Sequence, residues 1–173
     1  MAIRPHLMRS LNTKTARPDF CERKEHLMAS VFTKIINGEI PGNFVWQDEQ
    51  CVVFATIEPR SDGHMLVVPR EEVDNYLDAD PALIAHLSQV AQIIGQAGRD
   101  AFNVSRALIV VAGFDVPHLH IHVIPTDSMR VLHPDAKAAG SADSIKASCD
   151  KLRGALIELG FGANVPESLE SLG

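Results

Sequence analysis

Three histidines, His118, His120 and His122, alternate with apolar residues. Successive side chains of an extended strand point to opposite faces of a sheet, so this spacing predicts one face of imidazoles and one apolar face. The apolar face needs a hydrophobic core to cover it. We therefore expect a β-strand with its apolar side in the core and its histidine side in a functional site.

The spacing limits what the three imidazoles can do together. A strand rises about 3.3 Å per residue, so the outer two histidines are anchored about 13 Å apart, too far for all three to bind one zinc ion at about 2.0 Å. A metal site on two of them remains an alternative. A purely structural cluster is disfavoured, because adjacent imidazoles repel when protonated and need partners when buried. The row suits an anion, since imidazoles donate to phosphate oxygens while one free lone pair attacks phosphorus.

Residues 112–125 read AGFDVPHLHIHVIP, where the alternation ends in two apolar residues. This stretch resembles the defining motif of the histidine-triad (HIT) family of nucleotide hydrolases and transferases. Residues 32–41 (FTKIINGEIP) and 63–70 (GHMLVVPR) resemble the family in the same order, so the resemblance covers about residues 30 to 126. It implies a purine nucleotide or nucleoside phosphate ester as substrate, no cofactor, and pairing as a homodimer through the long helix and the strand before the histidines.

The resemblance also implies a role for each histidine. In the HIT family the middle histidine attacks the α-phosphorus of a nucleotide and forms a nucleotidyl-histidine intermediate, which water then hydrolyses. That position is His120 here. By the same resemblance His118 and His122 donate to phosphate, and His64 matches a fourth family histidine. His64 follows Gly63 and could instead simply begin a strand.

Several positions match the nucleoside pocket of the family. Four apolar residues match family residues that enclose the base, and all four are equally explicable as core: Phe32, Ile35, Phe54 and Ile57. Thr56 stands where the family commonly has an acidic or amide residue on the ribose. Its hydroxyl can make one such contact rather than a bidentate one.

Two residues before the histidines depart from the family pattern. Phe114 replaces a frequent glutamine, which removes an amide that would contact phosphate or the leaving group. Asp115 stands where some members have a serine or threonine on the phosphate, and a carboxylate there repels phosphate unless it points away or orients a histidine. Together with Thr56, Phe114 motivates an alternative function, a HIT-fold nucleotide-binding or regulatory protein with little turnover.

A bound metal is not expected. Zinc-bearing HIT members place two cysteines where this chain has Ser30 and Thr33, and a histidine where it has Glu72. The three cysteines, at positions 21, 51 and 149, are widely spaced and indicate neither a zinc knuckle nor a disulfide framework. They fit a reducing cytoplasm.

The periodicity predicts an α+β fold with a mainly antiparallel five-stranded sheet. Strands are expected at 43–47, 51–55, 64–68 and 105–112, followed by the histidine strand. Helices are expected at 30–36 with Ser30 as the cap, at 81–101 after an Asp80 cap, and at 143–159, with a further short helical segment at 71–77. The run at 108–111 is apolar on both faces, which predicts a central or interface-buried strand.

The chain divides into a mobile N-terminal arm (1–28), a HIT domain (29–128) and a C-terminal extension with one helix (129–173). A net charge of −6 argues against a general nucleic-acid binder, which usually carries a basic face. No apolar run approaches the roughly 18 residues that span a bilayer, so we expect no membrane partner.

Overall fold

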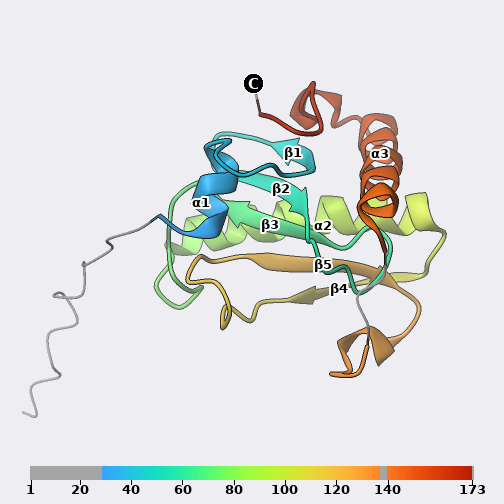
Figure 1. The fold of residues 1–173 in the computed structure, drawn as a ribbon, viewed down its shortest axis with the longest axis horizontal. Coiled ribbons are helices and arrows are strands. Elements are labelled where there is room, and N and C mark those ends of the chain that lie inside the picture. The colour runs from blue at the N-terminus through green and yellow to red at the C-terminus, as the bar shows by residue number, and fades with distance from the viewer. Residues whose placement is uncertain (1–28, 137–139, 173) are drawn as a thin grey trace, which may run out of the picture.

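The computed structural model describes residues 29–136 and 140–172, which form an α+β fold around one antiparallel sheet (Figure 1). The sheet has the order β1-β2-β3-β5-β4. Its strands are β1 (Phe44–Gln47), β2 (Cys51–Ala55), β3 (Met65–Pro69), β4 (Arg106–Val110) and β5 (Ile121–Thr126). The helices are α1 (Val31–Ile36), α2 (Pro81–Phe102) and α3 (Ala142–Glu158), with short 3-10 turns at Met129–Leu132 and Gly162–Asn164. The predicted fold class is confirmed.

Helix α2 begins and ends where its sequence predicts. The Asp80 side chain accepts from the backbone N–H of Ala82, and Pro81 occupies the first turn, where its missing N–H costs no hydrogen bond. Asn103 closes the helix in the left-handed conformation, with φ of 51°. One apolar stripe between these caps is buried against the sheet, and it contains Leu83, Leu87, Val90, Ala91, Ile94, Ala97 and Gly98.

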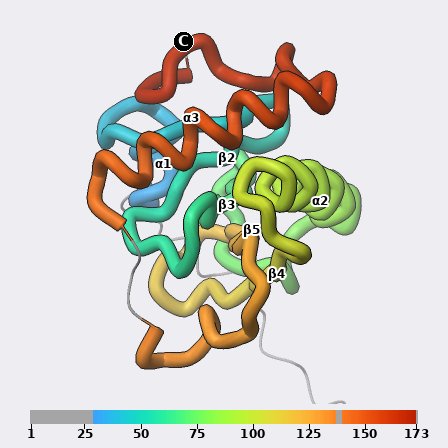
Figure 2. The backbone as a smooth tube through the Cα atoms, turned by 90° about the vertical axis from the view of Figure 1, so that its right-hand side faces the viewer, coloured from blue at the N-terminus to red at the C-terminus, as the bar shows by residue number. Residues whose placement is uncertain are grey.

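The two faces of the sheet belong to different hydrophobic clusters. On one face, α2 and α3 pack against alternate strand residues such as Val53, Val67 and Val123. Figure 2 shows α3 lying beside α2 on this side. On the other face, Phe32 of α1 packs against Phe54 and neighbouring strand residues. Leu66 on this face pairs in register with His122, so β5 presents that histidine on the α1 side of the sheet.

The C-terminal segment packs on the same core as the sheet. Cys149, Leu152 and Leu156 of α3 are buried in the cluster under α2. Arg153 of α3 donates to the carbonyl oxygens of Phe44 and Pro166, and beyond α3 the carbonyl oxygen of Leu169 accepts from the backbone N–H of Phe44 over 2.7 Å. The tail therefore covers the outer edge of β1. The boundaries of the HIT domain and the extension stay predictions, and the arm at 1–28 lies outside the described residues.

Three details of the predicted secondary structure were wrong. Residues 71–77 form turns rather than a helix. Of the two alternatives for β4, the central position is wrong because β4 is an edge strand with Ile109 54% exposed, and burial in an interface stays a prediction. β5 begins at Ile121, so only the last of the three histidines lies in the strand itself.

No helix within the described part of the chain is long and apolar enough to cross a bilayer.

Candidate active site

Ten of the eleven predicted site residues line one pocket of about 500 Å³ on the α1 side of the sheet. The ten are Phe32, Ile35, Phe54, Thr56, Ile57, His64, Phe114, Asp115, His120 and His122. The eleventh, His118, is fully buried behind the pocket. The apolar residues of the alternation, Leu119, Ile121 and Val123, pack in the core on the α2 side. The apolar face therefore packs in the core as predicted, and of the three histidines His120 and His122 line the pocket.

A backbone hydrogen bond determines which ring nitrogen of His120 can carry a free lone pair. Its Nδ1 lies 2.7 Å from the backbone carbonyl oxygen of His118, which can only accept a hydrogen bond. Nδ1 therefore carries the proton, and Nε2 carries the lone pair. The edge of Phe32 packs on the ring, with centroids 5.0 Å apart. Such an imidazole has the tautomer that a nucleophile needs.

His64 and His122 form a hydrogen-bonded pair beside His120. The backbone N–H of Arg60 donates to His64 Nδ1 over 3.1 Å, so the proton of His64 is on Nε2. This Nε2 lies 3.0 Å from His122 Nδ1 and donates to it, which leaves the proton of His122 on its own Nε2. The His122 and His120 rings are 4.8 Å apart. His122 can thus offer an N–H to an anion next to the lone pair of His120.

Burial keeps both members of this pair neutral. Desolvation, and then the nearby charges of His122 and Arg60, lower the pKa of His64 to about 3. Desolvation, and then His120 and Arg60, lower the pKa of His122 to about 4, although the Asp115 carboxylate acts in the opposite direction. At neutral pH the pair therefore donates N–H groups without carrying charge.

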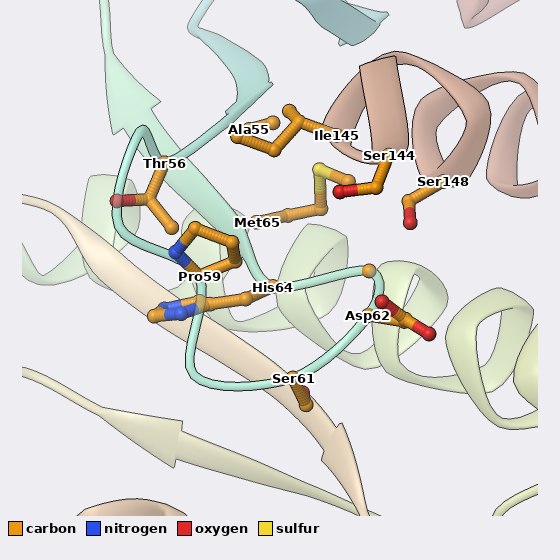
Figure 3. Close-up of a pocket in the computed structure, with 11 residues that line it drawn as sticks. Ala55, Thr56, Pro59, Ser61, Asp62, His64, Met65, Ser144, Ile145 and Ser148 are labelled. Atoms are coloured by element: carbon orange, nitrogen blue, oxygen red, sulfur yellow. The ribbon is translucent and has the colours of Figure 1, made fainter. Parts of the chain in front are cut away.

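The loop that carries His64 depends on glycine. Gly63 has φ of +74°, and a Cβ there would lie 2.2 Å from the ring of Phe102 at the end of α2. Figure 3 shows this loop passing a small cavity under the first turn of α3, with the imidazole of His64 pointing away from that helix. The glycine therefore lets the loop approach α2 closely while His64 turns toward the pocket.

His118 does not face the pocket, so the prediction that it donates to phosphate was wrong. Its Nε2 donates to Pro69 O over 2.9 Å, and its Nδ1 accepts from Ser30 Oγ over 2.7 Å. Both ring nitrogens are thus bound within the protein. The residue instead presents its backbone carbonyl to His120.

The positions that correspond to zinc ligands in the zinc-bearing HIT members, by the resemblance, carry oxygen groups here. Ser30 Oγ lies against His118, Thr33 Oγ1 donates to Glu72 Oε2, and the backbone N–H of Ser30 donates to the same oxygen over 3.2 Å. Two hydroxyls and a carboxylate around one imidazole do not match the cysteine and histidine ligands of a structural zinc site. Hydrogen bonds link these groups, and no step of the chemistry is assigned to a metal.

A second group of metal-ligating residue types is also satisfied by hydrogen bonds. In the described part of the chain, the side-chain atoms that could bind a metal come together in one group, which consists of Asp48, Cys51 and His86. His86 Nε2 lies 2.9 Å from Asp48 Oδ2, and Trp46 Nε1 donates to the same oxygen. Burial raises the pKa of Asp48, but its hydrogen bonds with Trp46, His86 and two backbone N–H groups lower it by more, so the pKa of Asp48 is lowered overall. Burial raises the pKa of the Cys51 thiol. The group ties the β1–β2 turn to α2.

Sequence reasoning missed two parts of this site. Ser30 was identified as a helix cap and as the counterpart of a zinc-binding cysteine, but not as the residue whose hydroxyl fixes the ring of His118. Arg60 was not identified, although it lines the pocket with the histidines. A basic residue in the short loop before His64 was the available signal, but a loop arginine is more often a solvated surface residue.

The chain belongs to the HIT family, because the HIT domain family model matches residues 37–129, more than half of the chain. Its fold is the one that the hydrolases and nucleotide-binding proteins of that family share. It is similar to an uncharacterized HIT-like protein of Methanocaldococcus jannaschii, 37% identical over 99 residues, which are 55% of this chain and 77% of the relative. Adenylylsulfatase HINT3 of Arabidopsis thaliana is 32% identical over 100 residues, 55% of this chain and 51% of the relative.

A solved structure agrees with the fold. It is that of a zinc-bound histidine triad family protein from Mycobacterium smegmatis, with a TM-score of 0.68 and 26% identity. The alignment covers 78% of this chain and 98% of that protein.

Proposed function

We propose that this protein is a nucleotide hydrolase or transferase that acts through a nucleotidyl-histidine intermediate on His120. Its substrate is a nucleoside phosphoramidate, a dinucleoside polyphosphate or a related phosphoester of a purine nucleoside. The observation that carries the proposal is the hydrogen bond from His120 Nδ1 to His118 O, which leaves the lone pair on Nε2 in a pocket that also holds a donor histidine.

The proposed reaction has two displacement steps at one phosphorus atom. His120 Nε2 attacks the α-phosphorus, a P–N bond forms, and the bond to the leaving group breaks, with its electron pair going to the leaving group. Water, or another hydroxyl acceptor, then attacks the same phosphorus, releases its proton to the solvent, and the P–N bond breaks, which returns the lone pair to Nε2. The N–H of His122 stabilises the negative charge on the phosphoryl oxygens in both steps.

The apolar end of the pocket suits a nucleoside. Phe32 and Phe54 contact each other edge to face, with centroids 5.5 Å apart, and Phe32 also packs on His120. Ile57 is 88% exposed at the rim, so it is available to cover a flat ligand rather than to fill the core. Thr56 lines the same pocket. We assign the base to this end and the ribose to Thr56.

The test is to trap the intermediate on His120. Rapid quench with a radiolabelled nucleotide ester should yield acid-labile nucleotidyl-protein in the wild type and none in a His120→Gly variant. Turnover of that variant should fall below about a tenth of the wild-type rate, while the Kd for a nucleoside monophosphate changes little, because a nucleophile acts mainly in the transition state. His133→Ala, which alters an exposed histidine outside the pocket, is the control.

The alternative is a nucleotide-binding or regulatory protein with little turnover. Phe114 favours it, since this side chain is 94% exposed at the pocket rim and has no group that donates to phosphate. A wild-type protein that binds nucleoside monophosphate but neither cleaves any tested ester nor forms the labelled intermediate would establish the alternative.

We also propose that the protein is a homodimer. The family resemblance supports pairing through α2 and the strand before the histidines, and β4 is the edge strand that α2 flanks.

A further inference from the structure

Arg60 is a pocket residue that the proposed mechanism leaves without a role. It lies in the loop between β2 and β3, is half-buried, and lines the same pocket as His64 and His122. Its backbone N–H fixes the tautomer of His64. Its positive charge is close enough to both histidines to help lower the pKa of each. A guanidinium is therefore held at the polar end of the pocket.

The described residues use little of the hydrogen-bonding capacity of this guanidinium. Nη1 donates to the backbone carbonyl oxygen of Ala136 over 2.6 Å, and this is the side chain's one hydrogen bond within residues 29–136 and 140–172. No carboxylate in those ranges pairs with it, although Asp115 lines the same pocket. An arginine presents five N–H groups in a fixed fork that matches an oxyanion. The geometry suits an anionic ligand.

The position of Arg60 identifies which part of a substrate it meets. Phe32 contacts His118 and His120, with centroids 5.9 Å and 5.0 Å apart, and so marks the nucleoside side of the nucleophile. In the opposite direction His122 follows His120 at 4.8 Å, and His64 follows His122 at 5.2 Å. The backbone of Arg60 is bonded to His64. Arg60 is thus at the far end of the histidine row, where the group beyond the α-phosphorus lies.

We infer that Arg60 binds the oxyanion of the leaving group, so that this protein prefers nucleotides whose leaving group departs as sulfate, phosphate or a polyphosphate. This inference rests on the proposed function. When His120 Nε2 bonds to phosphorus, the P–O bond to the leaving group breaks and its electron pair stays on that oxygen. The negative charge that develops there meets the guanidinium, and no proton has to be supplied.

The neutral histidines strengthen the case for an anionic leaving group. An amine leaves phosphorus readily only when a proton reaches its nitrogen. With pKa values of about 3 and 4, His64 and His122 carry no extra proton at neutral pH. Phe114 cannot donate one either. A leaving group that departs as a stable oxyanion avoids this requirement, and Arg60 is the cation in the pocket that can bind it.

A structural role for Arg60 is the competing explanation. Through Ala136 O the side chain joins the β2–β3 loop to the segment after the 3-10 turn at Met129–Leu132. In that case removing the guanidinium would loosen the loop and with it His64, which would slow every substrate alike. A ratio between two substrates with the same nucleoside therefore separates the two explanations.

The experiment compares adenylyl sulfate with adenosine 5′-phosphoramidate in wild type, Arg60→Gln and Arg60→Lys. For Arg60→Gln we expect kcat/KM to fall by at least about tenfold for adenylyl sulfate and by less than about twofold for the phosphoramidate, because only the first leaving group is an oxyanion. Arg60→Lys should keep part of the preference, since it retains charge without the fork. Arg70→Gln is the matched control, because Arg70 donates to a backbone carbonyl, Asp48 O at 2.8 Å, outside the pocket.

Each outcome decides the matter. Equal losses for both substrates, or no loss, in a folded Arg60→Gln variant would overturn the role of Arg60 while leaving the nucleotidyl-histidine mechanism in place. A wild type that cleaves the phosphoramidate faster than adenylyl sulfate would overturn the inferred preference. A wild type that cleaves neither and forms no labelled intermediate would overturn the proposed function itself, and this inference with it.

Discussion

At the scale of single residues, the reactivity of His120 depends on a residue outside the pocket. Ser30 Oγ donates to His118 Nδ1 over 2.7 Å, and His118 Nε2 donates to Pro69 O over 2.9 Å, so the His118 ring is fixed at both nitrogens. The backbone carbonyl of the same residue accepts from His120 Nδ1. Fixing the ring of His118 therefore also fixes the acceptor that determines the tautomer of His120.

Removing the Ser30 hydroxyl should affect stability and catalysis together. Ser30 caps α1, where its side chain accepts from the backbone N–H of Thr33. Ser30→Ala should lower the free energy of unfolding by about 1 kcal/mol, the usual cost of a lost N-cap, and reduce kcat/KM several-fold. Ser141→Ala removes the corresponding cap of α3 without touching a histidine, and should cost similar stability with unchanged activity. Equal activities in the two variants, measured beside urea unfolding, would exclude this role for Ser30.

The buried histidine pair should make stability fall in mild acid. Burial first, and then neighbouring charges, lowers the pKa of His64 to about 3 and that of His122 to about 4, whereas an unfolded histidine titrates near about 6.5. Between these values the unfolded chain binds more protons than the folded protein. The free energy of unfolding is therefore fully retained above about pH 6.5 and decreases as the pH falls below it. Urea unfolding at about pH 7.5 and about pH 5 should show a smaller loss for His122→Gln than for wild type.

At the scale of secondary-structure elements, local sequence determined most boundaries. β2 spans the predicted residues, and the caps Ser30 and Asp80 begin α1 and α2 as expected. The errors lie where contacts distant in sequence decide. β5 begins at Ile121 because its pairing with β3 begins there, opposite Val67. The apolar run on β4 predicted a central or interface-buried strand, and periodicity could not decide between them because strand order depends on connections that it does not encode.

The loop before β3 should be sensitive to a single added methyl group. Gly63→Ala introduces a side chain at φ of +74° and a Cβ 2.2 Å from the ring of Phe102. We expect a loss of at least about 1 kcal/mol in stability, and a loss of activity because His64 moves with the loop. Gly38→Ala is the matched control, since φ is +76° and no atom lies within 4 Å of the added Cβ. If both variants lose the same stability and keep full activity, the close approach to Phe102 does not position His64.

At the scale of the whole molecule, the sequence predicted the set of residues that line the pocket more accurately than it predicted the contacts of each residue. Ten of eleven predicted residues share the pocket because the motif positions and the strand alternation together specify one face. His118 has the same alternation but is buried, because it precedes the strand and turns toward Ser30 and Pro69. Arg60 could not be assigned from sequence, because its guanidinium is anchored by a carbonyl 76 residues further along the chain.

The free edge of the sheet makes a prediction about assembly. Among the described residues no strand pairs with the outer side of β4, and Ile109 on β4 and Val111 just after it are both exposed, which makes this edge a template for pairing with another chain. Size-exclusion chromatography with light scattering should give a mass of about twice the 18.9 kDa of one chain. Ile109→Lys should shift the protein to the monomer, because it introduces a charge into the apolar edge.

Ile157→Lys is the matched control for this prediction. Ile157 lies on α3 and is 57% exposed, close to the 54% of Ile109, but it is remote from β4 in the fold. It should leave the dimer intact, which would show that the effect at Ile109 depends on position rather than on added charge. A monomeric wild type would exclude the homodimer. A dimer that withstands Ile109→Lys would mean that the subunits pair through a surface other than β4.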